Sequence, residues 1–150
     1  MNITIRKAKP TDMANVLELI KELAAYERAP QEVENTVEMM LEDGFGDQPV
    51  FGCFVATSQD KILGMAIHYL KYSTWKGKKL YLEDLVVTKS ARGRGIGRQL
   101  FEQCLDYGRT LGCHSMMWQV LDWNEPAIQF YKKYKTSFSR EWVDCDLKIN

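Results

Sequence analysis

The sequence has no long apolar run and no excess of charge of either sign. Its 150 residues include 20 lysines and arginines and 20 aspartates and glutamates, so the formal net charge is zero. A general nucleic-acid or membrane-surface role therefore has no electrostatic support. No apolar stretch approaches the roughly 18 residues of a membrane span, and the amino-terminal residues lack the hydrophobic core of a signal peptide. These absences predict a protein with neither nucleic-acid nor membrane partners.

Cysteine and histidine are also scarce. The four cysteines, Cys53, Cys104, Cys113 and Cys145, form no C-x-x-C pair, and the chain has two histidines. This is neither a zinc-binding pattern nor a disulfide framework. We therefore expect reduced thiols in a cytoplasmic protein, and no metal site.

Repeats, low-complexity segments and linkers are absent as well. The apolar share of 45% and the charged share of 27% are those of a globular protein. A chain of this length can bury a sizeable core. We therefore predict a single domain over residues 1–150.

The spacing of apolar residues predicts a strand, two helices, three strands, a helix, a strand, a helix and a last strand. The strands are expected at 3–6, 51–56, 61–72, 79–87, 115–120 and 138–147. The helices are expected from 11 or 12 to about 26, from 35 or 36 to about 44, from 96 to about 111, and from 124 through 131. This order is typical of an α/β (α+β) fold, a mixed sheet covered by helices, with one crossover helix leading into a parallel strand.

One stretch, residues 80–98, indicates a chemical function. It begins with an apolar run that predicts a buried strand, interrupted by two carboxylates, Glu83 and Asp84. It ends with glycine at every second position, directly before a helical pattern; these residues are Gly93, Gly95 and Gly97. Glycines placed there let backbone N–H groups converge at the positive end of a helix dipole. Such a site suits a phosphate or pyrophosphate.

The glycine spacing distinguishes between phosphate-binding motifs. A dinucleotide fingerprint needs a third glycine where Arg98 stands, and a P-loop needs a Gly-Lys-Ser/Thr triplet that does not follow these glycines. The stretch from Arg92 to Gly97 instead resembles the acetyl-CoA signature Arg/Gln-x-x-Gly-x-Gly/Ala of the GCN5-related N-acetyltransferase (GNAT) superfamily. That resemblance implies a mixed, mostly antiparallel, twisted sheet flanked by helices. The alternative is a loop that only turns the chain into a helix.

Acetyl transfer to an amine requires a group that takes a proton, a donor to the developing oxyanion and an acid near the leaving thiolate. Glu83 is the candidate for relaying the proton, directly or through water. Because neighbours on a strand point to opposite faces, Glu83 and Asp84 face one ligand together only if a bulge intervenes. An ion pair with a nearby lysine or arginine is the alternative for both carboxylates. Residues 85–87 offer backbone groups to the pantetheine arm by strand addition.

Aromatic side chains supply the remaining candidates. A tyrosine hydroxyl such as that of Tyr131 stays protonated at neutral pH and can donate to a thiolate; the alternative is a core residue beside Phe130. Tyr26, Glu27 and Trp75 would form an aromatic and anionic wall for a cationic substrate, with partly buried surface packing as the alternative. The candidate substrate-binding residues are Tyr26, Glu27, Trp75, Glu83 and Asp84.

Four further segments are similar to the diamine (spermidine/spermine) N-acetyltransferase family, over nearly the whole chain up to residue 133. They are LIKELAAYE (19–27), LEDGFG (41–46), LYLED (80–84) and WNEPAIQFYK (123–132). The resemblance implies that Tyr131 is the general acid toward the coenzyme A sulfur and that Glu83 binds substrate and acts as a base through water. It also implies a homodimer. The acetyl-CoA-binding residues would be Leu85, Val86, Val87, Arg92, Gly93, Arg94, Gly95, Ile96, Gly97, Arg98, Asn124, Glu125, Pro126, Ala127 and Tyr131.

Two segments, YSTWKG (72–77) and VLDWN (120–124), look most like the branch that acetylates the side-chain amine of thialysine. In the polyamine branch an acidic residue typically stands where Ser73 stands. The tail departs from the family pattern, since Lys135 replaces a usual glycine and the chain is shorter. We therefore predict direct acetyl transfer from acetyl-CoA to a lysine-like amine in a ternary complex. A polyamine substrate, a protein amine and a non-catalytic acetyl-CoA sensor are the alternatives.

Overall fold

The computed structural model describes residues 2–150. The chain divides into two compact units, Met1–Gln119 and Val120–Asn150. The first unit contains the strands β1 (Thr4–Lys7), β2 (Gly52–Ser58), β3 (Lys61–Ser73), β4 (Gly77–Val87) and β5 (Ser115–Met117). Its α-helices are α1 (Met13–Tyr26), α2 (Val37–Phe45) and α3 (Ile96–Thr110). The second unit contains α4 (Glu125–Lys132).

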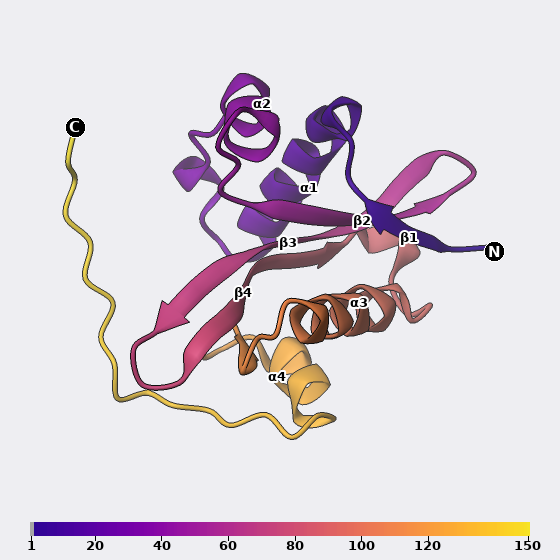
Figure 1. The fold of residues 1–150 in the computed structure, drawn as a ribbon. Helices are drawn as coiled ribbons and strands as arrows, with labels where there is room; N and C mark the ends of the chain where they lie inside the picture. Colours follow the sequence, from indigo (N-terminus) through magenta and orange to yellow (C-terminus); the bar gives the residue numbers. More distant parts are fainter. Residues whose placement is uncertain (1) are drawn as a thin grey trace. The chain divides into compact units, whose positions relative to one another are not determined.

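The described strands form one sheet in the order β1-β2-β3-β4-β5. Neighbouring strands from β1 to β4 are antiparallel, and β5 lies parallel to β4. The chain reaches β5 from β4 through α3, as the sequence predicts. Helices α1 and α2 cover one face of the sheet and α3 covers the other (Figure 1). The predicted mixed, mostly antiparallel sheet flanked by helices is therefore confirmed.

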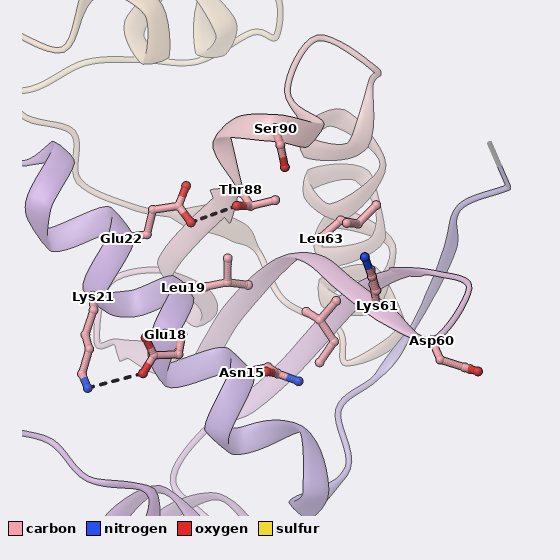
Figure 2. Close-up of a pocket in the computed structure, with 11 residues that line it drawn as sticks. Asn15, Glu18, Leu19, Lys21, Glu22, Asp60, Lys61, Leu63, Thr88 and Ser90 are labelled. Carbon is pink, nitrogen blue, oxygen red and sulfur yellow. Dashed lines mark hydrogen bonds and ion pairs between the residues drawn. The ribbon is translucent and has the colours of Figure 1, made fainter.

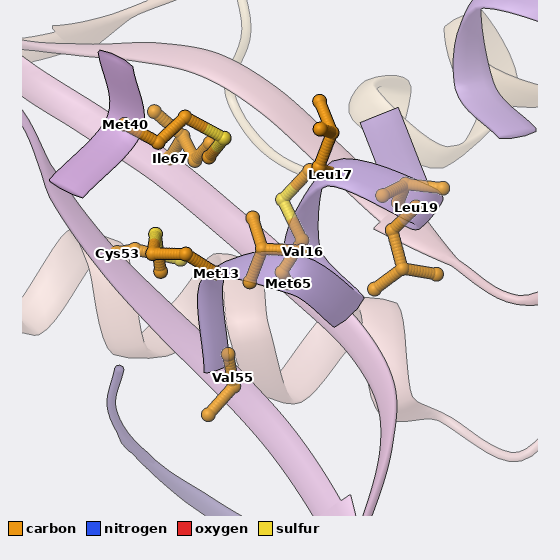
Figure 3. Packing of buried hydrophobic residues seen from close by; sticks show 10 residues of the cluster. Met13, Val16, Leu17, Leu19, Met40, Cys53, Val55, Met65 and Ile67 are labelled. Atoms are coloured by element: carbon orange, nitrogen blue, oxygen red, sulfur yellow. The ribbon is translucent and has the colours of Figure 1, made fainter. Parts of the chain in front are cut away.

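The main core lies between α1, α2 and the sheet (Figure 3). Apolar residues recur along α1 at helical spacing, so one side of the helix is buried. Val16 of α1, Val55 of β2 and Met65 of β3 are fully buried in this cluster. On strands β2 and β3 every second residue enters the cluster, as the alternation of a strand requires.

The start of α1 is held by a charged contact with β1. Asp12 is the residue before the helix, as predicted. Its carboxylate accepts hydrogen bonds from the Arg6 guanidinium at 2.7 and 3.1 Å and from the Lys9 amide at 2.7 Å. The hydrogen bond from Arg6 holds the pKa of Asp12 below its usual value. The edge strand and the first helix are therefore fixed to each other.

The end of the chain differs from its prediction. In the described chain, no regular secondary structure follows α4, and residues 137–150 are exposed. The last strand predicted at 138–147 is therefore wrong, because apolar residues alone do not make a strand without a hydrogen-bonded neighbour and a buried face. Strand β5 is also shorter than predicted and ends at Met117.

No helix in the described part of the chain is long and apolar enough to cross a membrane. Residues 2–150 also contain no group of three or more histidine, cysteine or acidic side chains arranged to hold a metal ion.

Candidate active site

Strand β4 carries a β-bulge at Glu83. In the ladder with β3, His68 pairs with Leu82 and Ile67 pairs with Asp84, which leaves Glu83 as the additional residue. A bulge of this kind places the two successive side chains on roughly the same face of the sheet. The structure thus meets the condition under which Glu83 and Asp84 face one ligand together.

Three carboxylates gather at this bulge. Glu27, the residue that follows α1, interacts electrostatically with both Glu83 and Asp84. Burial, then the charge of Glu83 and then that of Glu27, raise the pKa of Asp84 to about 7. Burial and Glu83 raise the pKa of Glu27 as well. Because each negative charge is disfavoured by the others, a cation bound among these carboxylates would be strongly stabilised.

A stacked tyrosine pair lies beside the carboxylates on the same sheet face. The Tyr69 hydroxyl donates a hydrogen bond of 2.8 Å to Oε1 of Glu83. The Tyr69 and Tyr81 rings stack with centroids 5.2 Å apart and an interplanar angle of 26°. Burial and the hydrogen bond to Glu83 raise the pKa of Tyr69, so its hydroxyl remains a donor at neutral pH. The Tyr69 hydroxyl therefore fixes the direction of the Glu83 carboxylate.

The glycine loop precedes α3 and has the backbone that a phosphate cradle needs. Gly93 and Gly95 have φ of +78° and +77°, and a Cβ at either would meet nothing within 4 Å. Gly95 is the residue before α3, where first-turn amides have no carbonyl of their own helix to bond. A Cβ on Gly97 would lie 3.7 Å from Cγ2 of Val87, which is ordinary contact. The open, left-handed backbone at Gly93 and Gly95 therefore fits a pyrophosphate.

Arg92 connects the glycine loop to α1. Its Nε donates a hydrogen bond of 2.9 Å to the Val87 carbonyl, and its guanidinium lies 5.6 Å from the centroid of the Tyr26 ring. It also forms an ion pair of 3.8 Å with Glu22. The structure thus brings together Arg92 and Tyr26, predicted to bind cofactor and substrate respectively. Further along, the side chain of Arg98 pairs with Glu102 at 2.9 Å.

Residues 85–87 end β4 and pair with β3 on one side. On the other side, the described ladder between β4 and β5 covers only Lys79–Tyr81. Beyond Tyr81 no described strand pairs with that edge of β4, so an extended ligand can add there as a strand would. Val86 itself is buried in the core, as expected for its side chain.

Trp75 lies away from the carboxylates in this chain. It stands in the turn between β3 and β4, and its side chain is 82% exposed. From Gly77, where β4 begins, to Glu83 is about 20 Å along a strand. Ser73 caps this turn, because its Oγ accepts hydrogen bonds from the Trp75 and Lys76 amides at 3.2 and 3.1 Å.

The second unit holds the remaining predicted residues. Asn124 precedes α4 and its side chain accepts a hydrogen bond from the Ala127 amide at 3.4 Å, with Pro126 in the first turn as predicted. Tyr131 is buried, and its ring meets that of Phe130 nearly edge-on, with centroids 5.4 Å apart.

A separate hollow of about 720 Å³ lies along α1 (Figure 2). It contains none of the predicted site residues, and its lining mixes both charges, including Glu18, Lys21 and Lys61. Within it, Glu22 accepts hydrogen bonds from Thr88 Oγ1 at 3.0 Å and from the Lys89 amide at 2.8 Å. These contacts support the segment that leads into the glycine loop.

Sequence reasoning missed Tyr69 and Glu22. Tyr69 contacts Glu83 only because β3 and β4 pair in one particular register, and Glu22 contacts residues 66 and 67 positions further along the chain. A period-2 pattern would have placed Tyr69 on one face of its strand, but no local pattern identifies its partner.

The sequence model described as "Acetyltransferase (GNAT) family" matches residues 15–135. The thialysine N-epsilon-acetyltransferase of Bos taurus is 38% identical over 138 residues, which cover 87% of this chain and 81% of the relative. A human spermidine/spermine N(1)-acetyltransferase-like protein is 39% identical over 134 residues, 85% of this chain but 19% of its own length.

The fold comparison agrees with the sequence comparison. The crystal structure of an aminoglycoside N-acetyltransferase in complex with CoA superposes with a TM-score of 0.78 at 18% identity, over 98% of this chain and 95% of that one. The predicted fold class and the predicted class of enzyme are thus confirmed. With a family match over most of its length, this chain belongs to the acetyltransferase (GNAT) family.

Proposed function

We propose that this protein transfers the acetyl group of acetyl-CoA to the side-chain amine of a lysine-like small molecule. The observation that carries the proposal is the group of three carboxylates at the β4 bulge, on the strand that leads into the glycine loop. The bulge within this strand can hold a cationic amine, and the strand's carboxyl end leads toward a cradle that suits a pyrophosphate. The thialysine N-epsilon-acetyltransferase relatives support this choice of substrate.

The carboxylates would bind the amine as an ammonium ion and then help it lose a proton. A primary alkylamine is almost wholly protonated at neutral pH and has no lone pair with which to attack. Glu83, exposed on the bulge and held by Tyr69, is in our proposal the group that accepts the proton, directly or through water. Glu27 and Asp84 add negative charge that favours the bound cation.

The chain's other residues would hold the thioester and release the thiol. Acetyl-CoA supplies the acetyl group as a thioester. The glycine-loop amides would bind the pyrophosphate, and residues 85–87 and 124–127 would hold the rest of the cofactor. The amine nitrogen forms a bond to the carbonyl carbon as the carbon–sulfur bond breaks. Tyr131 would give its proton to the departing thiolate, so that free CoA leaves as the thiol, and the proton that the acylated nitrogen loses would restore the Tyr131 hydroxyl.

A polyamine is the second candidate, because three carboxylates can hold more than one ammonium group. The contrast at Ser73 is weak by itself, since Ser73 caps the turn between β3 and β4 and an acidic side chain would cap it equally well. The human polyamine-type relative keeps this alternative open.

The test is a panel of amines with acetyl-CoA, followed by release of free thiol. We expect the highest kcat/KM for thialysine or lysine and lower values for diamines and spermidine. A highest value for spermidine would favour the polyamine alternative. Tight binding of acetyl-CoA without turnover of any amine would contradict the proposed activity and favour a sensor.

We also propose that the protein is a homodimer in the cytoplasm. The resemblance to a family of homodimers supports the first statement. The scattered cysteines support the second: Cys53 and Cys104 are buried in the structure, where burial raises the pKa of each thiol to about 12. Light scattering on the purified protein would test the dimer.

A further inference from the structure

The sheet face that carries Glu83 has a lysine at its other end. Lys71 of β3 is exposed, and its ammonium lies 5.5 Å from the centroid of the Tyr81 ring. The same ammonium lies 3.8 Å from the sulfur of Met117 on β5. The side chain therefore crosses from β3 over β4 and does not extend freely into solvent.

Charge is arranged along this face in opposite signs. Lys71 pairs directly across the ladder with Lys79, so two lysines meet at one end. Tyr69 and Tyr81 pair at the next position on this face and stack. The carboxylates at the bulge follow at the other end. The stacked tyrosine rings thus lie between a positively charged end and a negatively charged end of this sheet face.

We infer that Lys71 binds the α-carboxylate of the substrate, while the side-chain amine lies at Glu83. This inference rests on the proposed function and specifies the substrate as an amino acid. The lengths agree: the Lys71 ammonium lies over the Tyr81 ring, and Tyr81 precedes Glu83 by two residues, which is about 7 Å along a strand. In a lysine-like amino acid five atoms separate the amine from the carboxylate carbon, which is also about 7 Å when the chain is extended. The stacked tyrosines would contact the apolar part of that chain.

The same arrangement disfavours diamines. A second ammonium group would meet Lys71 and Lys79 instead of a carboxylate, and like charges repel. Lys71 and Lys79 thus give this end of the face a preference for a carboxylate over a second ammonium group.

The test compares two amines that differ only in the carboxylate, lysine and 1,5-diaminopentane. We expect the wild-type protein to have the higher kcat/KM with lysine. Lys71→Met keeps the apolar stem and removes the charge, and should lower kcat/KM for lysine about 10-fold. It should leave the diamine unchanged or improved. Lys71→Arg should retain the preference for lysine. Lys61→Met, at the exposed start of the same strand, is the control and should alter neither value.

The outcomes separate the two proposals. An equal loss for both amines in Lys71→Met, or no loss for lysine, would overturn the role of Lys71 while the acetyltransferase activity stands. A wild-type protein that prefers 1,5-diaminopentane would also overturn it. If the wild-type protein acetylates neither these two amines nor thialysine, the proposed function fails, and the assignment of Lys71 fails with it.

Discussion

Replacing Asp84 by asparagine should make the protein more stable above neutral pH. Burial beside Glu83 and Glu27 raises the pKa of Asp84 from 3.8 to about 7. A carboxyl group displaced so far costs the folded state at most about 4 kcal/mol once it is ionised in both states. Because the side chain is only partly buried, we expect about half of this, roughly 2 kcal/mol.

The sign of the effect follows from the direction of the shift. Because its pKa is raised in the folded state, Asp84 contributes its full stabilisation to the folded protein below pH 3.8. This stabilisation is lost as the pH rises through 7. The asparagine variant does not lose it. Relative to the wild type, its free energy of unfolding should therefore rise between pH 4 and pH 8. At pH 8 its urea midpoint should be about 1 M higher than that of the wild type.

Urea unfolding of both proteins at pH 4, 6 and 8 measures the difference directly. Asp60→Asn is the matched control, because Asp60 is an exposed carboxylate in the turn between β2 and β3. Any change with pH in the difference between this control and the wild type is subtracted from that of Asp84→Asn. An Asp84→Asn variant whose difference from wild type is the same at pH 4 and pH 8 would refute the carboxylate cluster as described.

Three further predictions concern the proposed chemistry. Tyr131→Phe should lower kcat about 100-fold while acetyl-CoA still binds; unchanged turnover would exclude Tyr131 as the acid. Glu83→Gln should lower kcat/KM for the amine about 100-fold at neutral pH, and the loss should shrink at alkaline pH, where free amine is abundant; a loss independent of pH would count against proton transfer. Gly95→Ala, at φ +77°, should lower the free energy of unfolding by about 1–2 kcal/mol and weaken acetyl-CoA binding, whereas Gly97→Ala should be tolerated. Thermal unfolding and titration with acetyl-CoA measure the two effects, and equal effects of both variants would contradict the prediction.

Local sequence was sufficient where local contacts decide the structure. Asp12, Thr36 and Asn124 begin helices at the predicted positions, and in the last two the side chain bonds an amide three residues ahead. The glycine loop was also predictable, because only glycine adopts the backbone of Gly93 and Gly95 without strain. Interactions within a few residues leave a pattern in the sequence that can be recognised.

Structure that depends on pairing between distant strands was not predictable. Whether Glu83 and Asp84 share a face depends on a bulge, and that bulge is defined only by the register of β4 against Ile67 and His68. The contact from Tyr69 to Glu83 depends on the same register. The predicted strand at 138–147 failed for the same reason, because an apolar segment does not determine which strand edge it will meet.

The central claim is that the acetyl group passes from acetyl-CoA directly to a side-chain amine. The measurement that tests it is mass spectrometry of one reaction of the wild-type protein with acetyl-CoA and thialysine, in which CoA and acetylated product are quantified together. We predict equal amounts of both, with the acetyl group on the side-chain nitrogen and none on the protein. Free CoA without acetylated thialysine, or an acetylated protein that forms before the amine is added, would contradict the claim.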